Sequence, residues 1–134
     1  CGVWKRDCGL MCINGQPRLS ALLLLDLLAK AKTEVWYAGD FDPEGLLIAQ
    51  KLKRYYSGSF HFWHMSSADY RASLSEERIT PRRLKILDGI ADEELRETAL
   101  AVKAAGRAGY QERLWAAYAR DLAEAGRKQT RKER

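Results

Sequence analysis

The stretch EVWYAGDFDPEGLLIAQKL, residues 34–52, places the strongest constraint on the fold, because an apolar strand-like run leads directly into a helix start. Residues 34–39 contain the apolar run VWYA and end at a glycine. Asp42 is a residue type that caps helices, and Pro43 suits the first helical position. The apolar side chains expected to face inward from this helix are Leu47, Ile48 and Leu52. The stretch therefore predicts a strand followed at once by a helix.

Similar segments flank this unit on both sides. The apolar run 9–14 predicts a buried strand that ends at an Asn-Gly turn. Residues 16–32 predict a helix with Pro17 in its first turn. Its leucines expected on one inward side are Leu19, Leu22, Leu23 and Leu27. Residues 60–65, FHFWHM, predict a third strand. This alternation of strands and helices is typical of an α/β fold, a parallel sheet flanked by helices.

The remainder of the chain predicts a helical C-terminal part. Polar residues 66–78 indicate a loop or a weak helix, and 81–90 indicate a short helix. From Asp92 onward the pattern is strongly helical, and Gly106 and Gly109 predict a break into two helices. We expect the aromatic residues of the strands to lie in the sheet core: Trp36, Tyr37, Phe60, Phe62 and Trp63. His61 and His64 fall on opposite faces of the predicted third strand, which favours structural roles for both.

Length and charge indicate one domain with a short tail. The chain of 134 residues is long enough to bury its own core, and we assign residues 1–126 to the domain. The tail, 127–134, carries five basic residues and one acidic residue, hence +4 of the net +5, and we expect it to be disordered. No apolar run approaches the length of a membrane span. The three cysteines, Cys1, Cys8 and Cys12, form no C-x-x-C pair, which favours reduced thiols and a cytoplasmic protein.

Three carboxylates stand at alternate positions where the second predicted strand ends: Asp40, Asp42 and Glu44. Ligands of α/β proteins bind beyond the carboxyl ends of the strands, and carboxylate oxygens suit Mg²⁺ or Mn²⁺. A helix start without any metal also explains Asp42 and Glu44, but it does not explain Asp40. An EF-hand is excluded because its twelfth position falls on Lys51 rather than on a glutamate. The pattern favours a divalent metal site.

The run YAGDFDPEGLLIAQKL resembles the Asp-x-Asp motif of Toprim domains, the metal-binding fold of topoisomerases, primases and several nucleases. With the upstream INGQPRLSALLLLDLLAKAKTEV it is most similar to the topoisomerase VI A subunit-like group. Within that group it most resembles the C-terminal Toprim domain of the nuclease subunit of Wadjet plasmid-defence systems. The similarity covers about residues 9–65 and extends to AGYQERL, 108–114.

The resemblance implies a metal-dependent DNA-cleaving domain. In that role Asp40, Asp42 and Glu44 would hold Mg²⁺ (or Mn²⁺) against a backbone phosphate. Glu112 would add a carboxylate, or it is an exposed helix acid that pairs with Arg113 or Lys103. Asn14, Gly15 and Gln16 would contact nucleic acid or simply form a turn. The implied partners are DNA, a second copy in a homodimer and an SMC-like ATPase complex, with no membrane. Topoisomerases use a tyrosine nucleophile and nucleases use water, so the nucleophile stays open.

Toprim domains carry a further Glu on an earlier strand, and the first eight residues are too short to supply it. We therefore expect the chain to be truncated on its N-terminal side, which leaves open whether it is active alone. Two alternatives remain. One is a non-catalytic Toprim-like module that binds DNA or holds a dimer together. The other is an α/β phosphotransferase or phosphatase acting on small molecules.

Overall fold

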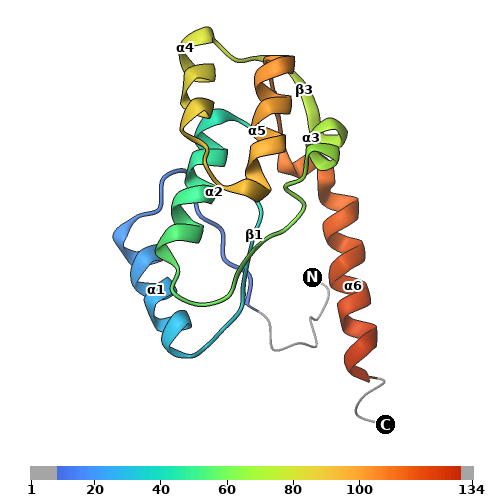
Figure 1. The fold of residues 1–134 in the computed structure, drawn as a ribbon. Coiled ribbons are helices and arrows are strands. Elements are labelled where there is room, and N and C mark those ends of the chain that lie inside the picture. The colour runs from blue at the N-terminus through green and yellow to red at the C-terminus, as the bar shows by residue number, and fades with distance from the viewer. Residues whose placement is uncertain (1–8, 131–134) are drawn as a thin grey trace.

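A computed structural model describes residues 9–130 of the chain (Figure 1). The first half contains α1 (Leu19–Lys30), β1 (Val35–Tyr37), α2 (Pro43–Tyr55) and β2 (Phe60–Phe62). The second half contains α3 (Ser67–Ser73), β3 (Leu74–Arg78), α4 (Pro81–Leu84), α5 (Glu93–Ala105), β4 (Arg107–Gly109) and α6 (Trp115–Thr130). Two short 3₁₀ helices, η1 (Lys85–Gly89) and η2 (Gln111–Leu114), precede α5 and α6.

The predicted β-α-β unit is confirmed. Strands β1 and β2 pair in parallel, with Val35 opposite Phe60 and Tyr37 opposite Phe62, and α2 connects them. The protein is therefore of the α/β class, with helices beside a small parallel sheet and a helical C-terminal part.

The predicted strand at 9–14 is wrong. These residues have no regular secondary structure, and Leu10 is 83% exposed. A strand needs a neighbour to pair with, and within residues 9–130 the parallel sheet has only β1 and β2. Only Ile13 of this run packs against the core. An apolar run without a pairing partner does not make a strand.

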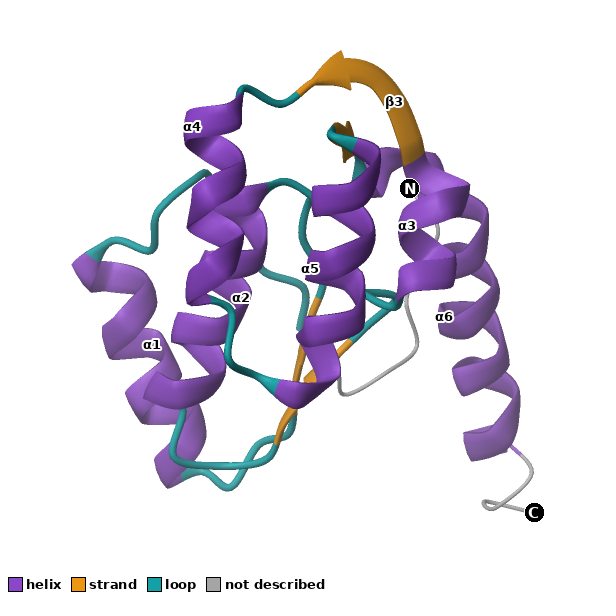
Figure 2. Cartoon of the chain, turned by 45° about the horizontal axis from the view of Figure 1, so that its top comes forward, coloured by secondary structure: helices purple, strands orange, loops and turns teal. Residues whose placement is uncertain are grey.

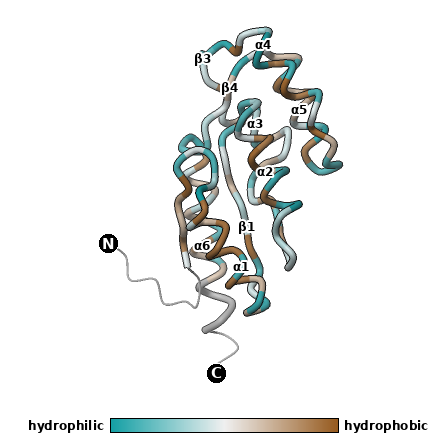
Figure 3. Tube along the Cα trace, turned by 90° about the vertical axis from the view of Figure 1, so that its left-hand side faces the viewer, coloured by the Kyte–Doolittle hydropathy of each residue, from teal (hydrophilic) through white to brown (hydrophobic). Residues whose placement is uncertain are grey.

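The inward face predicted for α1 is also largely wrong. Leu19, Leu23 and Leu27 are 71%, 54% and 61% exposed, and the buried residue is Leu25. Of the four leucines expected inward, only Leu22 packs against the core. Most residues of the helix are hydrophobic (Figure 3), with Ser20, Asp26 and Lys30 as the exceptions, so apolar side chains occur on almost every side. Periodicity alone therefore could not indicate which side of α1 is buried.

A second, antiparallel sheet was not predicted. Strand β3 pairs with β4, and Leu74 lies opposite Gly109. The sequence indicated only a loop or weak helix in the first segment and a helix break in the second. The break itself is confirmed, because Gly106 ends α5 in a left-handed conformation with φ of 63°. The sequence Arg-Ala-Gly of β4 has little preference for a strand, so tertiary contacts decide this pairing.

Helix α2 lies between two apolar clusters, with α1 on one side and α5 on the other (Figure 2). Ile48 and Leu52 face the α1 side, while Leu46 and Ala49 join the main core around α5. The predicted inward positions Ile48 and Leu52 are confirmed, and Leu47 is partly buried. Gln50 is buried, and its side chain bonds the Gly89 carbonyl and the amides of Ala91 and Asp92. These hydrogen bonds tie the segment before α5 to α2.

The junction between β1 and α2 is joined directly to β4. Phe41 is completely buried, and its amide and carbonyl both bond to Gly109, at 2.8 and 3.0 Å. A β-carbon on Gly109 would lie 2.5 Å from Ser73 Oγ and 3.3 Å from Phe41 Cβ. The two segments therefore approach closely only because residue 109 is glycine.

Two other expectations concern the aromatic residues and the tail. Trp36 is 57% exposed and stacks on the His61 ring at 4.4 Å, so its predicted place in the core is wrong. Tyr37, Phe60, Phe62 and Trp63 are partly buried against the core clusters.

Helix α6 continues to Thr130, through half of the predicted tail, and residues 131–134 lie outside the described part. None of the described helices is both long and apolar enough to cross a bilayer.

Gly109→Ala tests the contact between the β1–α2 junction and β4. We expect the free energy of unfolding to fall by about 1–3 kcal/mol, because the added methyl group overpacks a buried contact. Urea unfolding followed by circular dichroism measures the change. Gly89→Ala is the matched control, since no atom lies within 4 Å of a β-carbon there. Equal stability of the two variants would contradict this account.

Candidate acidic site at the junction of β1 and α2

The burial of Phe41 decides where its two acidic neighbours point. Successive side chains of an extended backbone alternate between sides. With Phe41 in the core, Asp40 and Asp42 lie on the opposite side, just beyond the carboxyl end of β1. The sequence prediction that these two carboxylates share one side is therefore consistent with the local backbone.

Asp42 begins α2 as predicted. Its Oδ1 accepts a hydrogen bond from the Gly45 amide at 2.6 Å, and Pro43 occupies the first helical turn. A β-carbon on Gly45 would collide with the Asp40 carbonyl oxygen and lie 2.9 Å from Asp42 Oδ1. The first turn of α2 is thus packed closely against the acidic segment, and only glycine fits at residue 45.

Arg83 on α4 contacts two of the three predicted carboxylates, and sequence analysis did not identify it. Its Nη2 lies 2.9 Å from Asp42 Oδ2 and 2.6 Å from Glu44 Oε2, and its Nε lies 2.9 Å from Glu44 Oε1. The hydrogen bonds from Arg83 lower the pKa of Glu44. In turn, the carboxylates raise the pKa of Arg83. Arg83 therefore neutralises this side of the site.

Asp40 stands on the other side of the site. Its Oδ1 accepts a hydrogen bond from the Gln111 amide at 3.1 Å. Burial raises the pKa of Asp40, and the negative charges of Glu112 and Asp42 raise it further, against the lowering effect of the Gln111 amide. Glu112, which the sequence comparison placed in the site, is thus close enough to act on Asp40 electrostatically. The charges of Glu112 and Asp42 thus act on Asp40, while Asp42 and Glu44 both contact Arg83.

Two tyrosines lie next to these carboxylates. Burial, followed by the charges of Asp40 and Asp42, raises the pKa of Tyr37 to about 12. Burial, followed by the charges of Asp69, Asp40 and Glu112, raises the pKa of Tyr118 to about 12. Tyr118 is 8% exposed, and its hydroxyl has no hydrogen-bond partner among the described residues. Both phenols are therefore neutral donors at physiological pH.

A second polar cluster follows β2. His64 lies outside the strand in a left-handed conformation with φ of 52°, so the predicted strand 60–65 is too long at its end. The ring nitrogens of His64 lie 3.2 Å from Asp69 Oδ1 and 2.7 Å from Asp121 Oδ2. Trp63 Nε1 also donates to Asp121, at 2.8 Å, and together with His64 lowers the pKa of that carboxyl. This cluster links α3 and α6 to the end of β2, a structural role like the one predicted for His64.

The Asn-Gly-Gln segment at residues 14–16 is an exposed bend, and Gly15 has φ of 72°. Because residues 9–14 form no strand, this segment does not follow a strand in the part of the chain that the structure describes. The turn predicted as one alternative is what the structure has here. Among the cysteines, Cys12 is exposed and free, while Cys1 and Cys8 lie outside the described residues.

The donors at the junction have the chemistry of a site for a hard divalent cation. Asp40, Asp42, Glu44 and Glu112 supply only carboxylate oxygens, which Mg²⁺ and Mn²⁺ prefer. The guanidinium of Arg83 already places a positive charge between Asp42 and Glu44. In this arrangement no three acidic, histidine or cysteine side chains within residues 9–130 converge into a finished metal site. The carboxylates therefore fit a metal only if Arg83 turns away from them.

The comparisons with known proteins identify a family for the chain. The sequence profile of the family described as "Protein of unknown function C-terminus (DUF2399)" matches residues 3–122. The chain therefore belongs to the DUF2399 family. No curated protein and no solved structure matches the chain.

Asp40→Asn tests the electrostatics of the site in the metal-free protein. The folded state holds the pKa of Asp40 above its ordinary value of 3.8, so an ionised Asp40 costs stability, and that cost grows as the pH rises through the raised pKa. We expect the variant to melt about 2 °C higher than the wild type at pH 7 in EDTA. Below pH 3.8 the difference should vanish, because Asp40 is then protonated in both states.

Asp42→Asn is the comparison variant, because it removes a charge that faces Arg83 rather than other acids. It should not raise the melting temperature at pH 7. Two outcomes would contradict this account of the charges: a higher melting temperature for Asp42→Asn, or an unchanged melting temperature for Asp40→Asn.

Proposed function

We propose that this chain is a Toprim-type, Mg²⁺- or Mn²⁺-dependent DNA-cleaving domain of a nuclease related to the Wadjet plasmid-defence systems. The observation that carries the proposal is the pair Asp40 and Asp42, which precede and follow buried Phe41 in the sequence and share the side opposite its ring. This places a group of carboxylates beyond the carboxyl end of a parallel strand, where α/β proteins bind their ligands. The resemblance of the Asp-x-Asp run to Toprim domains supplies the rest of the proposal.

In this function Asp40 and Asp42 would hold the cation, with Glu44 joining once Arg83 releases it. Glu112, whose charge raises the pKa of Asp40, would add a further carboxylate. The bound cation would supply positive charge that stabilises the leaving 3′-oxygen of a backbone phosphodiester. Asp42 also keeps the first turn of α2 in place through its bond to the Gly45 amide. Positioning and charge stabilisation are what phosphoryl transfer chiefly requires.

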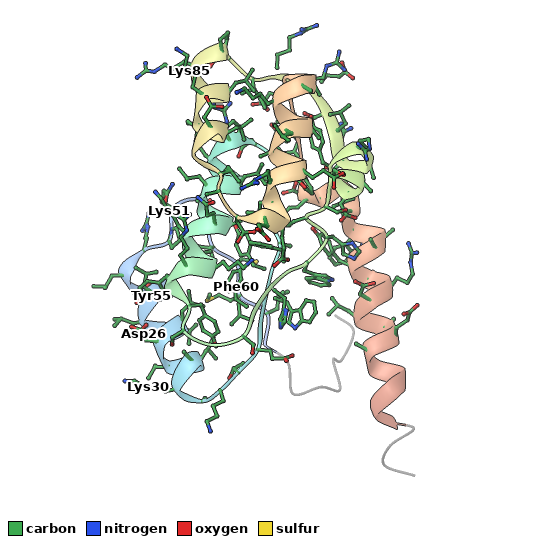
Figure 4. All side chains as sticks on the ribbon, viewed as in Figure 1. Asp26, Lys30, Lys51, Tyr55, Phe60 and Lys85 are labelled. Atoms are coloured by element: carbon green, nitrogen blue, oxygen red, sulfur yellow. The ribbon has the colours of Figure 1, made fainter. Side chains whose placement is uncertain are left out.

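The basic residues beside the site suit a polyanionic substrate. Arg82 and Lys85 are exposed next to Arg83, and Lys85 projects outward from its segment (Figure 4). Contacts from such side chains to phosphates position a nucleic acid without reading its sequence. Tyr37 and Tyr118 are unsuitable as nucleophiles, because burial and the acidic neighbours keep their hydroxyls protonated. We propose water as the attacking group, as in the nucleases that the sequence resembles.

The resemblance also suggests plasmid DNA as substrate, a homodimer and an SMC-like ATPase complex as partners, and a cytoplasmic location. The alternative is a non-catalytic Toprim-like module that binds DNA or holds a dimer together. One observation favours this alternative: Arg83 already neutralises Asp42 and Glu44. A side chain that permanently occupied these carboxylates would prevent cation binding.

Plasmid nicking by the full-length protein tests the function. With Mg²⁺ or Mn²⁺ present, we expect nicked or linear products, and a rate about 100-fold or more lower for Asp40→Ala, which loses a group of the charged site. Asp26→Ala is the control, because Asp26 is an exposed acid on α1 that contacts Tyr55 instead (Figure 4). Gel electrophoresis measures both rates. An Asp40→Ala protein that cuts as fast as the wild type would disprove the site assignment.

A further inference from the structure

Building on the proposed function, we propose that Arg83 is an exchangeable counter-ion. In the metal-free protein it holds Asp42 and Glu44, and when a divalent cation binds it passes to a phosphate of the nucleic-acid backbone. One side chain would thus make cation binding and nucleic-acid binding favour each other.

The first support is the geometry of the contact. The guanidinium uses Nε and Nη2 for Glu44 and shares Nη2 with Asp42, at distances of 2.6 to 3.1 Å. Nη1 faces a third carboxylate, that of Glu77, at 3.9 Å. A paired contact of this kind fixes the carboxylate oxygens in place. Arg83 is thus the cation on which Asp42 and Glu44 converge in this structure.

The second support is that the two cations compete for the same oxygens. Magnesium binds carboxylate oxygens at about 2.0–2.1 Å, which leaves no space for a guanidinium on the same face of Glu44 or Asp42. Asp42 Oδ1 is committed to the Gly45 amide, so Oδ2, the oxygen bonded to Arg83, is the one available. Cation binding to Asp42 therefore displaces Arg83.

The third support is that Arg83 can move without disturbing the fold. It lies on α4, a helix of four residues, and its side chain is 32% exposed. The apolar residue of this segment, Leu84, packs against the core and keeps the backbone in place. Only the side chain has to rotate, and the energy of a partly exposed ion pair is modest.

The fourth support is the chemistry of the released group. A guanidinium binds phosphate oxygens through two parallel hydrogen bonds, and arginine remains charged at all relevant pH values. A phosphodiester held by a cation at Asp40 and Asp42 would lie within reach of the side chain that had left Asp42. The displaced guanidinium keeps Glu77 near Nη1, and it gains a phosphate as a paired hydrogen-bond partner only when nucleic acid is present, which couples the two binding events.

Binding of Mn²⁺ alone, without nucleic acid, is the direct test. Electron paramagnetic resonance of free Mn²⁺ measures its dissociation constant for the full-length protein at pH 7.5. We expect Arg83→Gln to bind Mn²⁺ about tenfold more tightly than the wild type, because no guanidinium has to be displaced. Arg82→Gln, an exposed neighbour on the same helix, removes the same charge from the protein and should change the constant by less than about twofold. Arg83→Lys keeps the charge without the paired hydrogen bonds and should fall between the two.

The second measurement is nucleic-acid binding. Fluorescence anisotropy of a labelled DNA duplex, with Ca²⁺ in place of Mg²⁺, should show tighter binding by the wild type when the cation is added. Arg83→Gln should lose most of that gain, and Arg82→Gln should weaken binding equally with and without the cation.

The outcomes separate this inference from the function on which it rests. If the wild type binds Mn²⁺ and Arg83→Gln binds it no more tightly than Arg82→Gln, the exchange is disproved while the metal site stands. If folded wild type, Arg83→Gln and Arg83→Lys all fail to bind Mn²⁺, the carboxylates are not a metal site, and both proposals fail. A cation-dependent gain in DNA affinity that Arg83→Gln retains in full would also overturn the exchange.

Discussion

The pairing of Phe41 with Gly109 is the constraint on which the acidic site depends. Two backbone hydrogen bonds and a buried aromatic ring join the end of the first β-α unit to β4. The ring fixes the direction of Asp40 and Asp42, because neighbours in an extended chain point the opposite way. The same pairing places the residues just after Gly109 beside Asp40. Gln111, whose amide bonds Asp40, and Glu112, whose charge raises the pKa of Asp40, both belong to η2. A single contact thus assembles the site from segments far apart in the sequence.

The acidic site has two halves, and they differ in whether a positive charge offsets the carboxylates. Asp42 and Glu44 face a guanidinium and are satisfied. Asp40, partly buried near Glu112, has an amide donor but no cation within the described residues, and its pKa is raised accordingly. Such an imbalance costs stability and is the kind that functional sites maintain. The family assignment to DUF2399 carries no activity with it, so the case for metal-dependent chemistry rests on this imbalance and on the Toprim resemblance.

Some predictions succeeded because the signal was local. The helix start at Asp42 and Pro43, the helix end at Gly106 and the parallel pairing around α2 follow from caps, turns and short-range periodicity. Others failed because a local pattern did not contain the answer. Among residues 9–130 the run 9–14 has no strand to pair with, so its secondary structure could not be deduced from its own residues. Most residues of α1 are apolar, so its buried face could not be deduced either.

The amino-acid sequence by itself determined the acidic residues at the strand-to-helix junction, the cap that begins α2 and the α/β class. Tertiary structure alone decided which charges meet there. Arg83 lies 41 residues from Asp42, and the Gln111 amide lies 71 residues from Asp40. No helical or strand period spans such separations. These partners are set by how the chain closes its core, and core closure depends on the shape and volume of many side chains at once.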